Sequence, residues 1–135
     1  MDNLLNIVTH AGCFKTLLMA LETASLVELL QAPGSYTILA PTDEAFVNIP
    51  ANLINAWMEE IPKIKKIIRY HIILGDIRAN DFLKLNVVET LEGSTIAVNT
   101  SNGIKVNDAK VIKADIIAEN GVVHIIDKVL IPEGI

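Results

Sequence analysis

The spacing of apolar residues changes along the chain. Over Phe14–Leu21 they recur every three or four positions, which places them on one face of a helix. The stretch Ser25–Glu28 reads Ser-Leu-Val-Glu and predicts a capping box, in which the two polar side chains satisfy free backbone N–H groups where a second helix begins. Two more helices are expected over Leu53–Met58 and Lys63–Arg69, with the breaker Ile61-Pro62 between them.

A short extended segment interrupts these helices. Tyr36–Ala40 has the β-branched and aromatic content of a strand, and Pro41 should end it because proline has no N–H to donate to a sheet. Thr42 or Asp43 can then cap a short helix that buries Phe46. The sequence therefore predicts a strand, a turn and a helix in quick succession.

The last part of the chain is typical of strands. Tyr70–Leu74 is expected to be extended. Apolar and polar residues then alternate on both sides of Asn102-Gly103, which predicts a β-hairpin with a tight turn. Two longer strands are expected over Lys110–Ala118 and Gly121–Ile131. Helices that precede a meander of strands favour an α+β fold over a doubly wound parallel sheet.

Composition limits the size and the chemistry of this fold. The chain has 135 residues, so we expect one domain over residues 1–135. Hydrophobic residues make up 51% of the chain and aromatic residues only 4%, so the core must consist mainly of aliphatic side chains. The formal net charge of -5 disfavours nucleic acid as a partner, because an acidic surface repels phosphate. No apolar run approaches the ~18 residues of a membrane span, and we find no targeting signal in the chain as given.

Polar residues with reactive potential are few and scattered. The three histidines, at positions 10, 71 and 124, lack the close spacing of a zinc motif, so neither a metal nor a cofactor is expected. No nucleophile stands in a recognisable catalytic turn. An enzymatic hypothesis would need His71, His124, Asp43 and Thr42 to come within hydrogen-bond reach of one another. Asn99 begins a glycosylation sequon, whose use depends on a eukaryotic secretory pathway.

Two segments and a short motif between them resemble a known family. The segments are Tyr36–Phe46 (YTILAPTDEAF) and Asn120–Pro132 (NGVVHIIDKVLIP), and the motif is Tyr70-His71. In this order and spacing they closely resemble the signature motifs of the fasciclin domain family, and the resemblance covers essentially the whole chain. It implies N-terminal helices packed on a strongly twisted, wedge-like β-sandwich.

The resemblance also implies roles for individual residues. Adhesive activity in animal members has been assigned to an Asp-Ile pair and to the neighbourhood of the Tyr-His pair. The matching partner-binding positions in this sequence are Tyr70, His71, Asp115 and Ile116. A turn cap at Asp115 is the alternative, because the flanking residues depart from the animal pattern. The remaining motif residues are expected to hold the fold: Thr42, Asp43, Asn120, Gly121, His124 and Asp127.

The function that the resemblance implies is adhesion. We expect a non-enzymatic cell-adhesion or protein-interaction module that binds a protein or glycan partner as a monomer. By the same resemblance it should act outside the cell, in the periplasm or at the cell surface, and a single compact copy without paired cysteines is typical of microbial members. The alternative is a polysaccharide- or small-ligand-binding domain, with Tyr70 and His71 lining a pocket.

Overall fold

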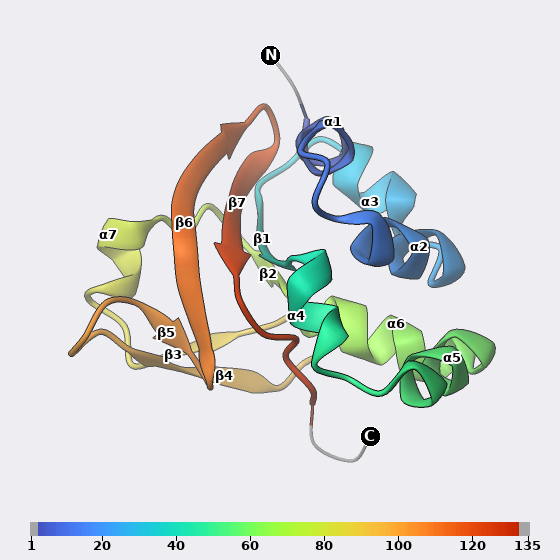
Figure 1. Ribbon diagram of the computed structural model, residues 1–135. Helices are drawn as coiled ribbons and strands as arrows, with labels where there is room; N and C mark the ends of the chain where they lie inside the picture. Colours follow the sequence, from blue (N-terminus) through green and yellow to red (C-terminus); the bar gives the residue numbers. More distant parts are fainter. Residues whose placement is uncertain (1–2, 133–135) are drawn as a thin grey trace.

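Helices dominate the first half of the chain and strands the second half. The computed structural model describes residues 3–132 (Figure 1). The helices are α1 Leu4–His10, α2 Lys15–Thr23, α3 Val27–Gln31, α4 Asp43–Val47, α5 Ala51–Glu59, α6 Ile61–Arg69 and α7 Ala79–Phe82. The strands are β1 Tyr36–Pro41, β2 Ile72–Leu74, β3 Val87–Glu89, β4 Thr95–Asn99, β5 Lys105–Val106, β6 Ala109–Ala118 and β7 Gly121–Ile126. The predicted α+β class is confirmed.

The strands form one mixed sheet in the order β2-β1-β7-β6-β5-β4-β3. Every neighbouring pair is antiparallel except β1 and β7, which run parallel from Tyr36 opposite Gly121 to Pro41 opposite Ile126. The long strand β6 belongs to both halves of the sheet, because it pairs with β7 along most of its length and with β5 at its start. Figure 1 shows β3, β4 and β5 crossing beneath the other half, which gives the two layers of the predicted sandwich.

The central strands separate two cores. On β1, Ile38 and Ala40 face the first core, which α1 to α6 cover, whereas Leu39 between them faces the second core inside the folded sheet. This split follows from the two-residue period of a strand, which sends successive side chains to opposite faces. Both faces of β1 and β7 are therefore buried, which explains their nearly continuous apolar sequence.

Asn120 and Gly121 join the helices to the sheet. Asn120 is buried; its side-chain oxygen accepts from the N–H of Leu4 at 2.9 Å and its amide donates to the carbonyls of Leu30 and Ala32 at 2.8 and 2.9 Å. A Cβ at Gly121 would lie 1.9 Å from the carbonyl oxygen of Tyr36, so only glycine allows β7 to approach β1 this closely. One dipeptide therefore fixes the start of α1, the end of α3 and the β1–β7 pairing.

Several local predictions differ from the structure. Ser25 does not cap α3: it has a φ of 59° and lies just beyond α2, where its N–H bonds to the Glu22 carbonyl and the next N–H, of Leu26, bonds to the Leu21 carbonyl. This is a helix C-terminal motif, which competed with the capping box for the same residues. Pro62 lies in the first turn of α6, where its missing N–H costs nothing, so Glu60 separates the two helices.

Two predicted strands are shorter than expected. Tyr70 and His71 form the turn after α6, and only Ile72–Leu74 is extended. Strand β7 ends at Ile126 instead of continuing to Ile131. There, Asp127 accepts from the Lys110 N–H at 2.7 Å and its own N–H donates to the Lys110 carbonyl at 3.1 Å. The side chain of Asp127 thus closes the β6–β7 ladder and turns the chain away.

Candidate functional site

The first signature segment holds three elements together. The Thr42 hydroxyl caps α4 by accepting from the N–H of Ala45 at 3.3 Å. The carboxylate of Asp43 accepts from the N–H groups of Lys15 and Thr16 at 3.3 and 2.9 Å, so it serves the exposed donors where α2 begins. A negative charge is favourable at that end of a helix. Both side chains thus bond to backbone groups.

His71 is buried, with 1% of its surface exposed. Its Nδ1 lies 2.8 Å from the carbonyl oxygen of Ile67, and its Nε2 lies 2.9 Å from the backbone nitrogen of Leu130. A carbonyl only accepts and an amide only donates, so the ring is neutral with the proton on Nδ1. Burial lowers the pKa of His71 to about 4, against the opposing effect of the Ile67 hydrogen bond. His71 therefore fastens the C-terminal segment to α6.

Tyr70 lies at the wall of a cleft. Its hydroxyl donates to the carbonyl of Thr95 at 3.1 Å and accepts from the side-chain amide of Asn107 at 3.0 Å, while only 6% of the residue is exposed. The cleft has a volume of about 1010 Å³, and polar and charged residues such as Ser94 and Asp108 share its lining with apolar ones. It opens between α6, the β3–β4 hairpin and the C-terminal segment.

Side chains from three neighbouring strands form hydrogen bonds to the segment that leads into α7. The Thr37 hydroxyl of β1 donates to the Gly75 carbonyl at 2.7 Å and accepts from the Ile77 N–H at 2.8 Å. His124 of β7 places its Nε2 2.6 Å from the Ile77 carbonyl oxygen. Asp115 of β6 accepts from the N–H of Ala79, the first residue of α7, at 2.8 Å. We call Thr37, His124 and Asp115 the α7 clamp.

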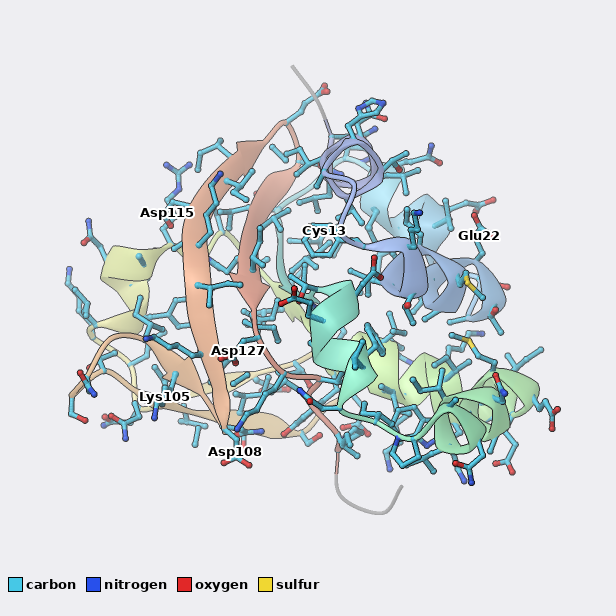
Figure 2. The ribbon with its side chains drawn as sticks, in the orientation of Figure 1. Cys13, Glu22, Lys105, Asp108, Asp115 and Asp127 are labelled. Atoms are coloured by element: carbon cyan, nitrogen blue, oxygen red, sulfur yellow. The ribbon has the colours of Figure 1, made fainter. Side chains whose placement is uncertain are left out.

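Asp115 reaches α7 because β6 bulges there. Two residues of β6, at positions 114 and 115, lie opposite His124 alone, and Asp115 adopts a φ of 59°. Aspartate tolerates this left-handed conformation better than most residues, although it costs of order 1 kcal/mol. The backbone N–H of Asp115, displaced from the ladder, donates to His124 Nδ1 at 3.1 Å. Figure 2 shows Asp115 on the side of β6 that faces α7.

The two residues of the Asp-Ile pair face opposite sides of the sheet. The Asp115 side chain is 42% exposed, whereas Ile116 packs partly against the first core. Ile117 is 37% exposed. It lies two positions after Asp115, on the same face of β6. The surface available at this point is therefore Asp115 with Ile117, which we call the bulge surface.

Charges cluster around the α7 clamp. The guanidinium of Arg78 pairs with Asp76 through bonds of 3.0 and 3.2 Å, and these bonds with the nearby carboxylates of Asp115 and Asp81 raise the pKa of Arg78. His124 is fully buried, and burial lowers its pKa, while the Ile77 hydrogen bond and the charges of Asp115 and Asp76 oppose that effect. The corner thus has three carboxylates to one guanidinium.

The predicted partner-binding residues lie in separate places. Tyr70 and His71 are both buried in the turn after α6, and of the two Tyr70 lines the cleft. Asp115 belongs to the α7 clamp. Figure 2 shows Asp108, which lines the cleft, at the end of β6 opposite to Asp115. Within residues 3–132, the bonds of Thr42, Asp43, His71 and His124 run to different backbone groups and not to one another.

Sequence reasoning missed two residues of these sites. Thr37 appeared only as a β-branched strand residue, and Asn107 was not singled out at all. Asn107 has a φ of 54°, and its carboxamide accepts from the Ala97 N–H at 2.9 Å besides reaching Tyr70. The available signal was the Asn-Asp pair at the turn before β6, because asparagine is enriched where a residue must adopt positive φ.

Neither a metal centre nor a membrane span is found among residues 3–132. Among residues 3–132, no three His, Cys, Asp or Glu side chains are arranged so that they could hold a metal ion. None of the helices in that part of the chain has the length and apolar character that a membrane crossing requires.

The chain is similar to known proteins over nearly its whole length. The fasciclin domain model matches residues 12–132. An uncharacterized protein of Synechocystis, sll1735, is 39% identical over 97% of this chain and 98% of its own length. Transforming growth factor-beta-induced protein ig-h3 of Sus scrofa is 34% identical, and the match covers 98% of this chain but 20% of that protein.

The fold is similar to that of a solved structure with a related sequence. A FAS1 domain pair from the insect cell adhesion molecule Fasciclin I aligns with a TM-score of 0.66 and 26% identity, over 88% of this chain and 45% of that one. The fold match and the family match agree with the signature segments found in the sequence. This chain belongs to the fasciclin domain family.

Proposed function

We propose that this chain is a non-enzymatic adhesion or interaction module of bacterial origin, which acts at a cell surface or in an extracellular matrix or envelope. Membership of the fasciclin family supports the class of function, since a structurally similar relative is the insect cell adhesion molecule Fasciclin I. The Synechocystis relative of matching length supports the bacterial origin. A protein or glycan is the expected partner.

The observation that carries this proposal is the contrast between interior and exterior polar groups. Within the described residues, each buried side-chain N or O atom has a hydrogen-bond partner, and the motif residues bond mainly to backbone groups. These side chains are committed to the fold. The bulge surface, in contrast, is open to solvent: the Asp115 side chain is 42% exposed although one of its oxygens caps α7, and the apolar side chain of Ile117 follows on the same face of β6.

A binding measurement with matched variants tests the proposal. The purified domain at micromolar concentration should bind immobilised matrix extract or bacterial envelope extract, and Ile117→Ser should weaken binding about tenfold, which is ~1.4 kcal/mol for an anchor residue. Leu74→Ser is the control, because Leu74 is 68% exposed on β2, away from β6. Absence of binding, or equal loss in both variants, would refute the proposed surface.

The cleft favours a second function, the binding of a glycan or another polar small ligand. Its volume of about 1010 Å³ accommodates a short oligosaccharide, and its lining mixes donors and acceptors with the exposed apolar residues Val87 and Ile131. A thermal-shift screen with oligosaccharides should raise the melting temperature if such a ligand binds the folded domain. No stabilisation by any sugar at millimolar concentration would exclude this candidate for the sugars used.

A further inference from the structure

His124 links the interior of the domain to the bulge surface. The ring is fully buried between β6 and the segment before α7, and it forms a T-shaped pair with the ring of Phe82 at a centroid distance of 5.2 Å. Its Nε2 bonds to the Ile77 carbonyl, in the segment that the α7 clamp holds, and its Nδ1 accepts from the N–H of Asp115, another member of the clamp. A change in the protonation of this ring therefore acts on the exposed residue Asp115 through a single hydrogen bond.

The hydrogen bonds fix the protonation state of His124. The Ile77 carbonyl accepts, so Nε2 must carry a proton, and the Asp115 N–H donates, so Nδ1 must be bare. The ring is therefore neutral in this arrangement. A second proton could bind only at Nδ1, where it would face the N–H of Asp115 at the present 3.1 Å separation of the two nitrogens.

A nearby acceptor can take the new proton. Asp115 Oδ1 lies 4.0 Å from His124 Nδ1, and it is the same oxygen that caps α7 at Ala79. An imidazolium competes strongly for this carboxylate, because a charge-assisted hydrogen bond is about twice as strong as a neutral one. Protonation of Nδ1 would therefore break its hydrogen bond with the Asp115 N–H. It would also draw the Asp115 carboxylate away from the Ala79 N–H and toward the ring.

Two charged groups act on His124, and they come from two elements. Asp115 lies on β6, and Asp76 lies in the segment before α7, where it pairs with Arg78. On the β1 side the ring's neighbours are not titratable: Leu39 stands opposite it in the register, and Thr37 holds the same segment. The charges of Asp115 and Asp76 favour the arrival of a proton, while burial of the ring is the larger effect and lowers the pKa of His124 below its ordinary value.

We propose that His124 is a proton-sensitive latch, whose protonation at Nδ1 releases Asp115 from the start of α7 and rearranges the bulge surface. Acidification then changes the presentation of Asp115 and Ile117 without unfolding the two cores. The consequence for partner binding rests on the proposed function, but the latch itself does not. Asp115 connects the ring to the surface, because its positive φ is stabilised by its hydrogen bonds to Ala79 and His124, and protonation disturbs both of these bonds.

Nuclear magnetic resonance of the free domain tests the latch. As the pH falls from about 7.5 to about 4.5, a range that extends well below the ordinary histidine pKa because burial lowers that of His124, the His124 ring signals and the backbone amides of Ala79 and Asp115 should titrate together, reversibly, with secondary structure retained. In His124→Gln, which supplies a donor and an acceptor but no titration, the Ala79 change should vanish. In His71→Gln, which removes the other buried histidine, it should persist. Persistence in His124→Gln, or His124 titration without an Ala79 change, overturns the latch.

A second variant keeps the test decisive if His124→Gln does not fold. Asp115→Asn preserves an oxygen acceptor for the Ala79 N–H but removes the charge, so the His124 midpoint should move to lower pH. An unchanged midpoint overturns the role of the carboxylate. Repeating the binding assay with envelope extract at both ends of the pH range separates the two ideas. Coupled titration without binding at either pH leaves the latch intact and refutes the proposed function.

Discussion

As the pH is lowered toward 4, His71 is protonated at a higher pH in the unfolded chain than in the folded domain. The folded ring uses Nδ1 to hold Ile67 and Nε2 to hold Leu130, and its Nε2 can accept that N–H only when bare. Its pKa is lowered from 6.5 to about 4. The unfolded state therefore binds more protons across this interval, and the free energy of unfolding must fall as the pH falls.

The size of the effect follows from the pKa difference. A pKa difference of one unit corresponds to about 1.4 kcal/mol. The difference between 6.5 in the unfolded state and about 4 in the folded state therefore lowers the free energy of unfolding by roughly 3 kcal/mol at acidic pH. The side chain is 1% exposed, so solvent screening reduces this value little. The stabilisation is complete above pH 6.5 and is lost as the pH falls toward 4. That loss is a large share of a typical domain stability of about 5–15 kcal/mol.

Urea unfolding at a series of pH values measures this effect. The buried indole of Trp57 provides a fluorescence signal for the transition. His71→Gln should be less stable than the parent near neutral pH but should lose about 3 kcal/mol less on acidification. The carboxylates titrate in both proteins, so the difference isolates His71. If the two stability curves stay parallel within ~0.5 kcal/mol, the assignment of a buried neutral ring is wrong.

Two further predictions concern the Asn120-Gly121 junction. Gly121→Ala places a Cβ 1.9 Å from the Tyr36 carbonyl oxygen, so it should cost about 3 kcal/mol of stability or prevent folding. The control Gly12→Ala lies in open space at a φ of 79° and should cost about 1 kcal/mol in the same urea assay. Equal losses in the two variants would contradict the clash. Asn120→Ala leaves three backbone groups without partners and should cost about 3 kcal/mol, with increased amide exchange at Leu4; unchanged exchange there would contradict the role of Asn120.

The fold class could be read from the sequence because its signals are local. The apolar period of three to four residues in the first half and of two in the second follows directly from helix and strand geometry. The cap at Thr42 was also readable, since a hydroxyl after a strand-ending proline has free N–H groups within three residues. The error at Ser25 arose where two local signals overlapped and the C-terminal motif of α2 prevailed.

The candidate sites could be read only in part. The family resemblance drew attention to Asp115, Tyr70 and His124, but it did not distinguish buried from exposed positions. The contacts that define the α7 clamp join residues 36 to 47 positions apart, such as Ala79 with Asp115 and Ile77 with His124. Thr37 remained unnoticed because nothing in its neighbourhood distinguishes a clamp from an ordinary strand residue.

By itself, the sequence determined which segments become helices and strands, the aliphatic character of the core and the family. These properties depend on side chains within a few positions of one another, so a linear pattern carries them. The tertiary structure decided that Ile116 turns inward while Asp115 stays exposed and caps α7. That outcome depends on a β6 bulge opposite His124, and the register of two strands is set by the whole sheet rather than by either strand alone.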